Sequence, residues 1–190
     1  MVTAQETTRP PITERAREHA RTIPNSWLQV FDPVVERVVG AVSEAVIGRY
    51  LVDARGEITD TYVENPRYQG PGNELEGAMF LVGAGSIPLE EALLAVLGAE
   101  LVLPLDPARR DRPHLVLREE PGVRVVDAFT SDRVAPADWP QHWQRRTGAE
   151  LAVVFDRADE RFELRLCGPA GVRLTVPGDE LARALHATVL

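Results

Sequence analysis

The chain has 190 residues, of which 44% are hydrophobic and 26% charged, a composition typical of a globular protein rather than a disordered one. Its net charge is −8, from 21 basic and 29 acidic side chains. A negative field of this kind repels phosphate backbones, so nucleic acid is excluded from the partners that we expect.

Residues 1–23 predict a flexible leader that contains at most a short helix. Over 12–22, only Ile12, Ala16 and Ala20 share an apolar stripe, which is too little to fold alone. The leader lacks the apolar stretch of a secretory signal, and no segment reaches the ~18 apolar residues that a membrane span needs. We therefore expect a cytoplasmic protein whose leader is dispensable for folding.

The stretch PNSWLQVFDP, residues 24–33, predicts the first strand. Apolar residues from Trp27 to Phe31 fall on both faces, which indicates a strand buried on both sides. Asp32-Pro33 ends it, because proline has no N–H to donate to a sheet. Residues 34–44 have a mixed apolar period and predict either a helix or an irregular segment.

A β-hairpin follows, in which VIGRYLVD and ITDTYVEN flank the turn 53–56. Asp53 favours this turn by bonding the nearby backbone, and Gly56 supplies the positive φ that the turn requires. After a loop, residues 75–98 predict helical structure, most clearly over 88–97.

The second half predicts strands, helices and a closing meander. Strands are expected in ELVLPL, HLVLRE and VRVVDAF, and a short helix from Asp138 to Gly148. The meander comprises LAVVFD, RFELRL and VRLTV, and a last helix runs from Asp179 to Ala187. Grouped strands with helices between them indicate an α+β fold, a single domain over 24–190 with a mixed or antiparallel sheet.

No pattern in the chain predicts a catalytic, cofactor or metal site. FLVGAGSIPLEE lacks the third glycine of a dinucleotide motif, and its two glutamates would repel a pyrophosphate. A single cysteine, Cys167, excludes a thiolate metal site, and no two histidines have helical metal-ligand spacing. A long-range site that joins His114 to Asp127 or to glutamate residues remains as the basis of a hydrolase alternative.

Two tryptophans are the candidate partner-binding residues. Trp139 and Trp143 are four residues apart, so the predicted helix over 138–148 places them on one face. Tryptophan buries a large area and is enriched at interaction hot spots. Packing in the core is the alternative role of both rings.

Several stretches together resemble a known family. PNSWLQVFDP, VIGRYLVDARGEI and ENPRYQGP resemble the opening of the type VII secretion system-associated proteins of high-GC Gram-positive bacteria. LEEALLAVLGAELVLPLD, VVDAFTSDRV and LTVPGDELARAL are similar to the SseB-type N-terminal domain. The resemblance covers roughly residues 24–188, and it departs from the family over 34–45 and at VVFDRADERF.

The resemblance implies a non-enzymatic bacterial accessory protein, an adaptor or chaperone-like module with a protein partner from a type VII secretion system. It brings no catalytic residues with it. Besides the hydrolase, an immunity-type inhibitor remains an alternative, since an acidic surface suits a basic toxin.

Overall fold

The computed structural model describes residues 9–108, 114–138 and 142–188. The α+β class and the mixed sheet that the sequence predicted are confirmed. The chain forms two compact units, residues 1–70 and 71–190, whereas the sequence placed 24–190 in one domain and the leader outside it. The reason is that each unit has a sheet of its own, and the leader packs on the first of them.

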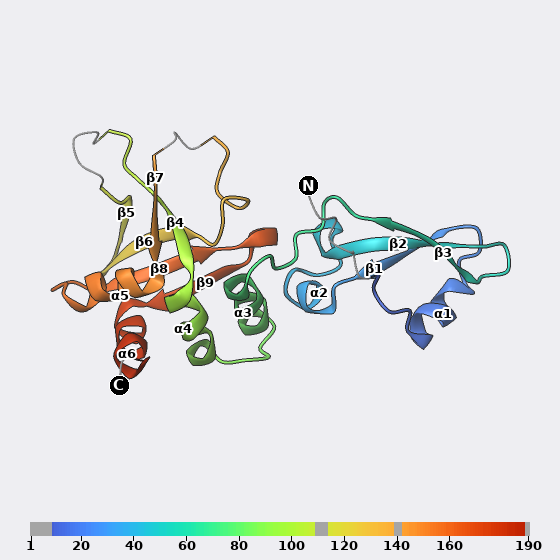
Figure 1. The fold of residues 1–190 in the computed structure, drawn as a ribbon, viewed down its shortest axis with the longest axis horizontal. Helices are drawn as coiled ribbons and strands as arrows, with labels where there is room; N and C mark the ends of the chain where they lie inside the picture. Colours follow the sequence, from blue (N-terminus) through green and yellow to red (C-terminus); the bar gives the residue numbers. More distant parts are fainter. Residues whose placement is uncertain (1–8, 109–113, 139–141, 189–190) are drawn as a thin grey trace, which may run out of the picture. The chain divides into compact units, whose positions relative to one another are not determined.

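The N-terminal unit is a three-stranded antiparallel sheet with short helices (Figure 1). Its strand order is β1-β2-β3. The elements are α1 (Glu14–Ala20), β1 (Trp27–Phe31), α2 (Pro33–Val39), the 3-10 turn η1 (Ser43–Ala45), β2 (Val46–Val52) and β3 (Ile58–Glu64).

The leader is part of this unit from Arg9 onward, which corrects the expectation of a flexible tail. Helix α1 is capped by Thr13, and its last residue, Ala20, is fully buried against Leu28 and Val52. The Tyr50 hydroxyl donates a 2.9 Å hydrogen bond to the Pro10 carbonyl. The apolar stripe of α1 is too narrow to stabilise the helix alone, and packing against the sheet stabilises it.

Strand β1 forms where the sequence predicted it, but it is not buried on both sides. Among the described strands it pairs with β2 alone, and Leu28 is its one buried residue. Leu28 packs against α1, whereas Gln29 on the opposite face is exposed, so the stronger burial is confined to one face of the strand. The hairpin is confirmed: Asp53 Oδ1 accepts bonds of 2.8 Å from two turn amides, and Gly56 has a φ of +79°.

The C-terminal unit is a mixed sheet in the order β7-β4-β6-β8-β9, with β5 paired to the start of β6. Strands β6 and β8 are parallel, and the other pairs are antiparallel. The elements are α3 (Glu74–Gly83), α4 (Leu89–Gly98), β4 (Glu100–Pro104), β5 (Leu117–Glu120), β6 (Val123–Phe129), β7 (Trp143–Thr147), α5 (Gly148–Asp156), β8 (Phe162–Cys167), the turn η2 (Pro169–Gly171), β9 (Arg173–Pro177) and α6 (Gly178–Thr188).

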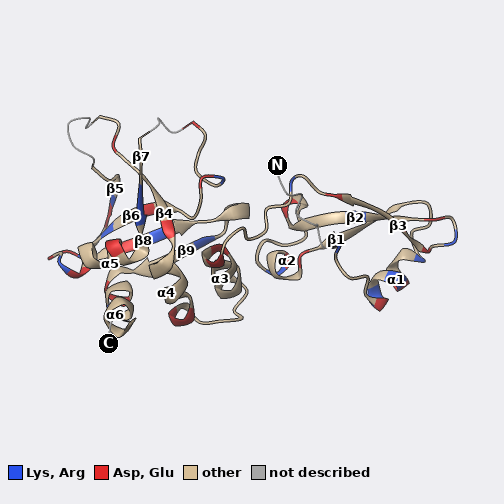
Figure 2. Cartoon of the chain, viewed as in Figure 1, with Lys and Arg blue, Asp and Glu red and all other residues tan. Residues whose placement is uncertain are grey.

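The two faces of this sheet differ in chemistry. Leu164 and Leu166 of β8 are fully buried, and α6 packs against β8 and β9. On the alternate residues, Arg165 bonds Glu120 at 3.2 Å. Figure 2 shows positions of charged residues, in blue and red, along β8. The helices therefore cover an apolar face, while the opposite face carries ion pairs.

Two sequence predictions fail between 138 and 156. The expected helix over 138–148 is replaced by β7, which pairs with β4, and the expected strand LAVVFD is helix α5. A capping box explains both errors: Thr147 accepts from the Glu150 amide, and the Glu150 carboxylate accepts from the Thr147 amide. This box starts the helix at Gly148, so the meander begins one element later, at β8.

Candidate functional site

Asp32 of the Asp-Pro motif links separate segments of the N-terminal unit, and we call this set of contacts the Asp32 joint. Asp32 Oδ1 accepts hydrogen bonds from the amides of Val34 and Val35, at 2.9 and 3.2 Å, and so caps α2. Asp32 Oδ2 accepts a 2.6 Å hydrogen bond from the Tyr68 hydroxyl. The Asp-Pro and Asn-Pro-x-Tyr motifs, 36 residues apart, are therefore in direct contact.

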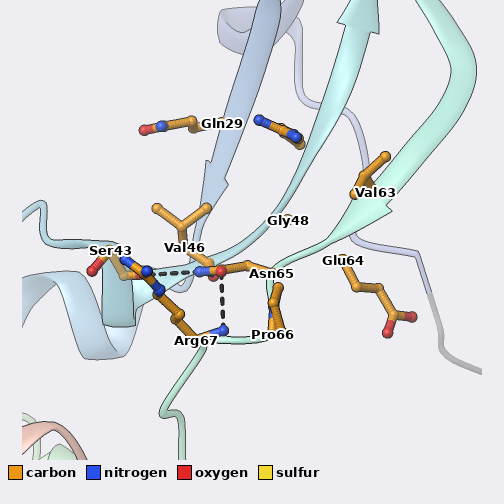
Figure 3. Close-up of a pocket in the computed structure, with 10 residues that line it drawn as sticks. Gln29, Ser43, Val46, Gly48, Val63, Glu64, Asn65, Pro66 and Arg67 are labelled. Atoms are coloured by element: carbon orange, nitrogen blue, oxygen red, sulfur yellow. Dashed lines mark hydrogen bonds between the residues drawn. The ribbon is translucent and has the colours of Figure 1, made fainter.

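Asn65 of the second motif ties the end of β3 to the start of β2. Its amide group donates to the carbonyls of Ser43 and Val46 at 2.7 and 2.8 Å, and its Oδ1 accepts from the Arg67 amide at 3.0 Å (Figure 3). A shallow pocket of about 460 Å³ lies beside it. Since all these bonds are to the backbone, Asn65 acts as a turn residue.

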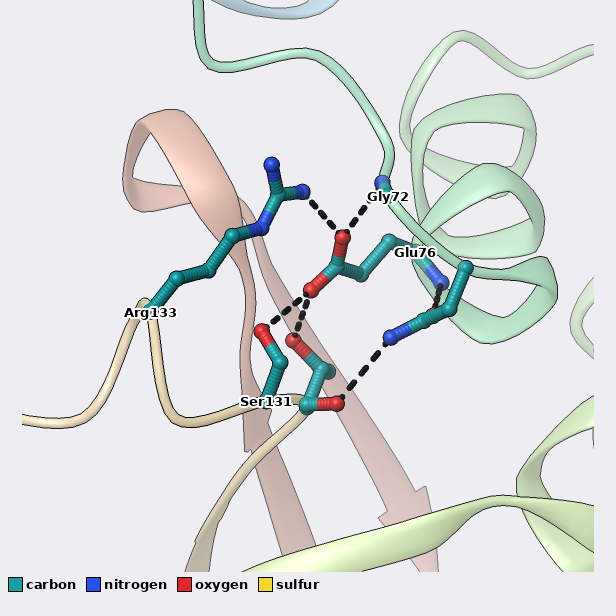
Figure 4. A network of polar contacts seen from close by, with 6 residues as sticks. Gly72, Glu76, Ser131 and Arg133 are labelled. Carbon is teal, nitrogen blue, oxygen red and sulfur yellow. Dashed lines mark hydrogen bonds and ion pairs between the residues drawn. The ribbon is translucent and has the colours of Figure 1, made fainter. Parts of the chain in front are cut away.

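A buried carboxylate is the most connected polar group described in the C-terminal unit. Glu76 is fully buried near the start of α3. Its two oxygens accept bonds from the Gly72 amide at 2.7 Å, from the Thr130 and Ser131 hydroxyls at 2.8 and 2.9 Å, and from the Arg133 guanidinium (Figure 4).

Burial by itself raises the pKa of the Glu76 carboxyl, but these four donors more than offset it and hold the pKa below its usual value. Each oxygen has two donors, so this carboxylate is ionised and satisfied. It joins α3 to the loop after β6, and its two hydroxyl donors are the Thr and Ser of the Phe-Thr-Ser motif. Glu76 was not among the residues predicted from the sequence, although the pattern Asn73-x-x-Glu76 is typical of a helix start and marks it.

His114 and Asp127, the pair named for the hydrolase alternative, form no hydrogen bond or ion pair with each other in the described part of the chain. Asp127 is held by two bonds from Arg118, at 2.8 and 2.9 Å. Another histidine, His186, lies 3.5 Å from Asp156, and both side chains are exposed. Among the described residues, no three His, Cys, Asp or Glu side chains are grouped to hold a metal ion.

Cys167 lies half-buried at the end of β8. Burial, followed by the nearby Asp127 charge, raises the pKa of its thiol. A raised pKa disfavours the thiolate, so Cys167 is suited to packing rather than to nucleophilic chemistry.

Of the two candidate tryptophans, Trp139 lies outside the described residues. Trp143 starts β7 rather than continuing a helix, so the helical spacing that related the two rings does not apply. Trp143 is half-buried and meets Phe129 edge to face, with ring centroids 5.8 Å apart. Its role as a partner-binding residue stays a prediction.

An apolar groove in the N-terminal unit is the surface best suited to binding. It runs along β1 between α1 and α2 and has a volume of about 1040 Å³. This is at the upper end of the range for small-ligand sites. Its apolar lining includes Ile12, Ala16, Ile23, Leu28, Val30 and Tyr50.

The backbone of β1 adds hydrogen-bonding capacity to this groove. The Val52 amide bonds the Ser26 carbonyl across the β1–β2 pair, at 2.8 Å. Along an antiparallel strand, the backbone N–H and C=O groups of alternate residues point toward the partner strand and away from it. Those of Trp27 and Gln29 point away from β2, toward the outer edge of the sheet. No described residue bonds these groups. We call this surface, the groove together with the side of β1 that faces away from β2, the β1 groove.

Comparisons with protein-family models, with curated proteins and with solved structures found no match to this chain. In the described ranges, every helix is too short or too polar to cross a bilayer. The structure thus defines an α+β protein with an apolar groove beside an edge strand, β1, whose outer side is not paired with any other described strand.

Proposed function

We propose that this chain is a non-enzymatic protein-binding module, an adaptor or chaperone-like accessory protein of a type VII secretion system. The observation that carries the proposal is the β1 groove, where apolar side chains lie beside backbone groups that no described residue bonds. Such a surface suits a segment of another protein, since it offers both apolar contact and main-chain hydrogen bonds. The link to the secretion system comes from the sequence resemblance.

The roles of the polar motif residues support binding over catalysis. Three polar side chains are central to these contacts: Asp32 and Asn65 belong to the two motifs, and Glu76 is the centre of the buried network. Each is held by several hydrogen bonds that join elements of the fold. Residues engaged in this way position a surface and are not poised to react with a substrate.

A charge placed in the groove tests the proposal. Ile12→Asp puts a carboxylate on the half-buried groove wall, and Val63→Asp puts the same group on an exposed site of β3 away from the groove. The tagged full-length protein and both variants are used for affinity purification from the native cell, followed by mass spectrometry. Melting curves check that all three are folded.

We expect the wild type and Val63→Asp to recover a secretion-system component or a small helical substrate, and Ile12→Asp to recover at least tenfold less of it. Equal recovery by all three proteins would overturn the groove as the binding surface. Recovery of a toxin alone would favour the immunity-type inhibitor, and hydrolysis of an ester or peptide that His114→Ala abolishes would favour the hydrolase.

A further inference from the structure

Resting on the proposed function, we infer that the partner binds the β1 groove as an added β-strand, antiparallel to β1. The added segment is extended and uncharged at its centre, with apolar residues at alternate positions. It carries a basic residue at its N-terminal end and an acidic residue at its C-terminal end.

The edge strands of the described chain show why β1 is the place for strand addition. β3 carries Asp60 and Glu64, β5 carries Arg118 and two glutamates, β7 carries two arginines, and β9 carries an arginine and a proline. Charges and proline on an edge strand prevent pairing with another chain. Within the described residues, WLQVF of β1 is the edge strand that lacks both.

Side-chain alternation sets the pattern of the partner. Leu28 pairs with Tyr50, and Val30 shares their face of the sheet, which lies against the groove. Gln29 pairs with Arg49 on the opposite face, although it also borders the groove. In an antiparallel pair, residues directly opposite each other share a face. Partner residues opposite Leu28 and Val30 therefore enter the apolar groove, and those opposite Trp27 and Gln29 exchange hydrogen bonds with β1.

Charges at the two ends of the β1 groove determine the direction in which the added segment runs. Arg15 and His19 line the end formed by α1, which packs near Leu28 through Ala20. Glu36 lines the other end, on the helix that follows Phe31. Arg15 and Glu36 are exposed, and no ion pair to another described residue is formed by either. An antiparallel segment with its acidic end near Arg15 and its basic end near Glu36 complements both.

The probe is the peptide Arg-Thr-Val-Thr-Val-Thr-Glu-amide with fluorescein on its N-terminal amine, titrated with the full chain by fluorescence anisotropy. N-methylation of its two valines leaves the amides that face β1 intact, because groove-facing residues direct their N–H away from β1. N-methylation of its three threonines removes those amides. We expect the valine-methylated peptide to bind as the parent does, and the threonine-methylated peptide to bind at least about tenfold more weakly.

Protein variants provide the matched test. Gln29→Pro removes an outward N–H without touching the β1–β2 ladder, and Gln29→Thr keeps it. We expect about tenfold weaker binding with Pro, and a change within about twofold with Thr. Exchanging the terminal Arg and Glu of the peptide should also weaken binding, by about threefold or more.

Equal binding of the two methylated peptides, no binding of the parent, or a reversed methylation preference would overturn antiparallel strand addition. A dimer of the chain that Gln29→Pro dissociates would also overturn it, because a second copy would then occupy the edge. If strand addition fails while Ile12→Asp still abolishes partner recovery, the proposed function stands. If Ile12→Asp has no effect on recovery, the proposed function fails instead.

Discussion

The Tyr68 hydroxyl donates a hydrogen bond of 2.6 Å to Asp32 Oδ2, which joins two motifs that are 36 residues apart in the N-terminal unit. Because Asp32 also caps α2 through its other oxygen, one carboxylate fixes the end of β1, the start of α2 and the loop after β3. This joint holds one end of the β1 groove in place.

Tyr68→Phe should lower the free energy of unfolding by about 2 kcal/mol, since a hydrogen bond to a charged group is lost. Tyr62→Phe is the matched control: the Tyr62 hydroxyl is buried without a partner among the described residues, so its removal should be neutral or stabilising. Denaturant unfolding measures both. Equal destabilisation by the two variants would contradict the role of the Tyr68–Asp32 bond.

A chain that begins at Pro24 should melt more than ~5 °C below the full chain, a loss on the order of 1 kcal/mol or more. Removal of α1 uncovers Leu28 and Val52, and Tyr50 loses its bond to Pro10. A chain that begins at Arg9 retains all of these contacts and is the control. Melting curves that coincide for the Pro24 and Arg9 chains would show that the packed leader adds no stability.

Glu76→Gln should cost about 2 kcal/mol, because an amide cannot accept from all four donors. The pKa of Glu76 is lowered by folding, so its stabilisation is fully present above the unfolded pKa of about 4.3 and is lost as the pH falls below it. Wild type should therefore lose stability more steeply on acidification than the variant. The exposed Glu74→Gln on the same helix should keep the wild-type profile, and parallel profiles for Glu76→Gln and wild type would contradict this account.

Two glycine-to-alanine substitutions should change the free energy of unfolding in opposite directions. Gly148 starts α5 against the end of α4, where a Cβ would overlap the carbonyl oxygen of Val96. Gly77 lies inside α3 with open space around it. Gly77→Ala should stabilise the protein by about 0.5–1 kcal/mol through helix propensity, whereas Gly148→Ala should destabilise it by about 1–3 kcal/mol. Thermal melts that move in the same direction would disagree with the close approach of α4 and α5.

Trp143→Ala should cost about 1–3 kcal/mol, less than the loss of a fully buried tryptophan, because the ring is half-buried and contacts Phe129. Trp143→Phe, which keeps an aromatic ring there, is the control. If Trp143→Ala keeps the melting temperature and loses the partner in the affinity purification, Trp143 is a partner anchor and not a packing residue.

Local sequence patterns were sufficient where the determining contacts are themselves local. The hairpin of β2 and β3 was predicted because Asp53 and Gly56 define its turn within four residues. Helix α4, the closing helix α6 and strand β8 were predicted from apolar period and length. The Thr147–Glu150 capping box is also a local pattern. A helix was predicted over β7 and a strand over α5 because the start of the helix was not assigned from this box.

The amino-acid sequence by itself determined the α+β class, most elements and the motifs, since turns, caps and apolar periods act over a few residues. The tertiary structure alone decided that β1 is an edge, that the leader covers Leu28, and that Asp32 meets Tyr68. These facts depend on which distant segments pair, and pairing is a balance of packing and chain entropy over the whole unit. The β1 groove arises from that balance, because the same WLQVF sequence would be a core strand if another strand lay beside it.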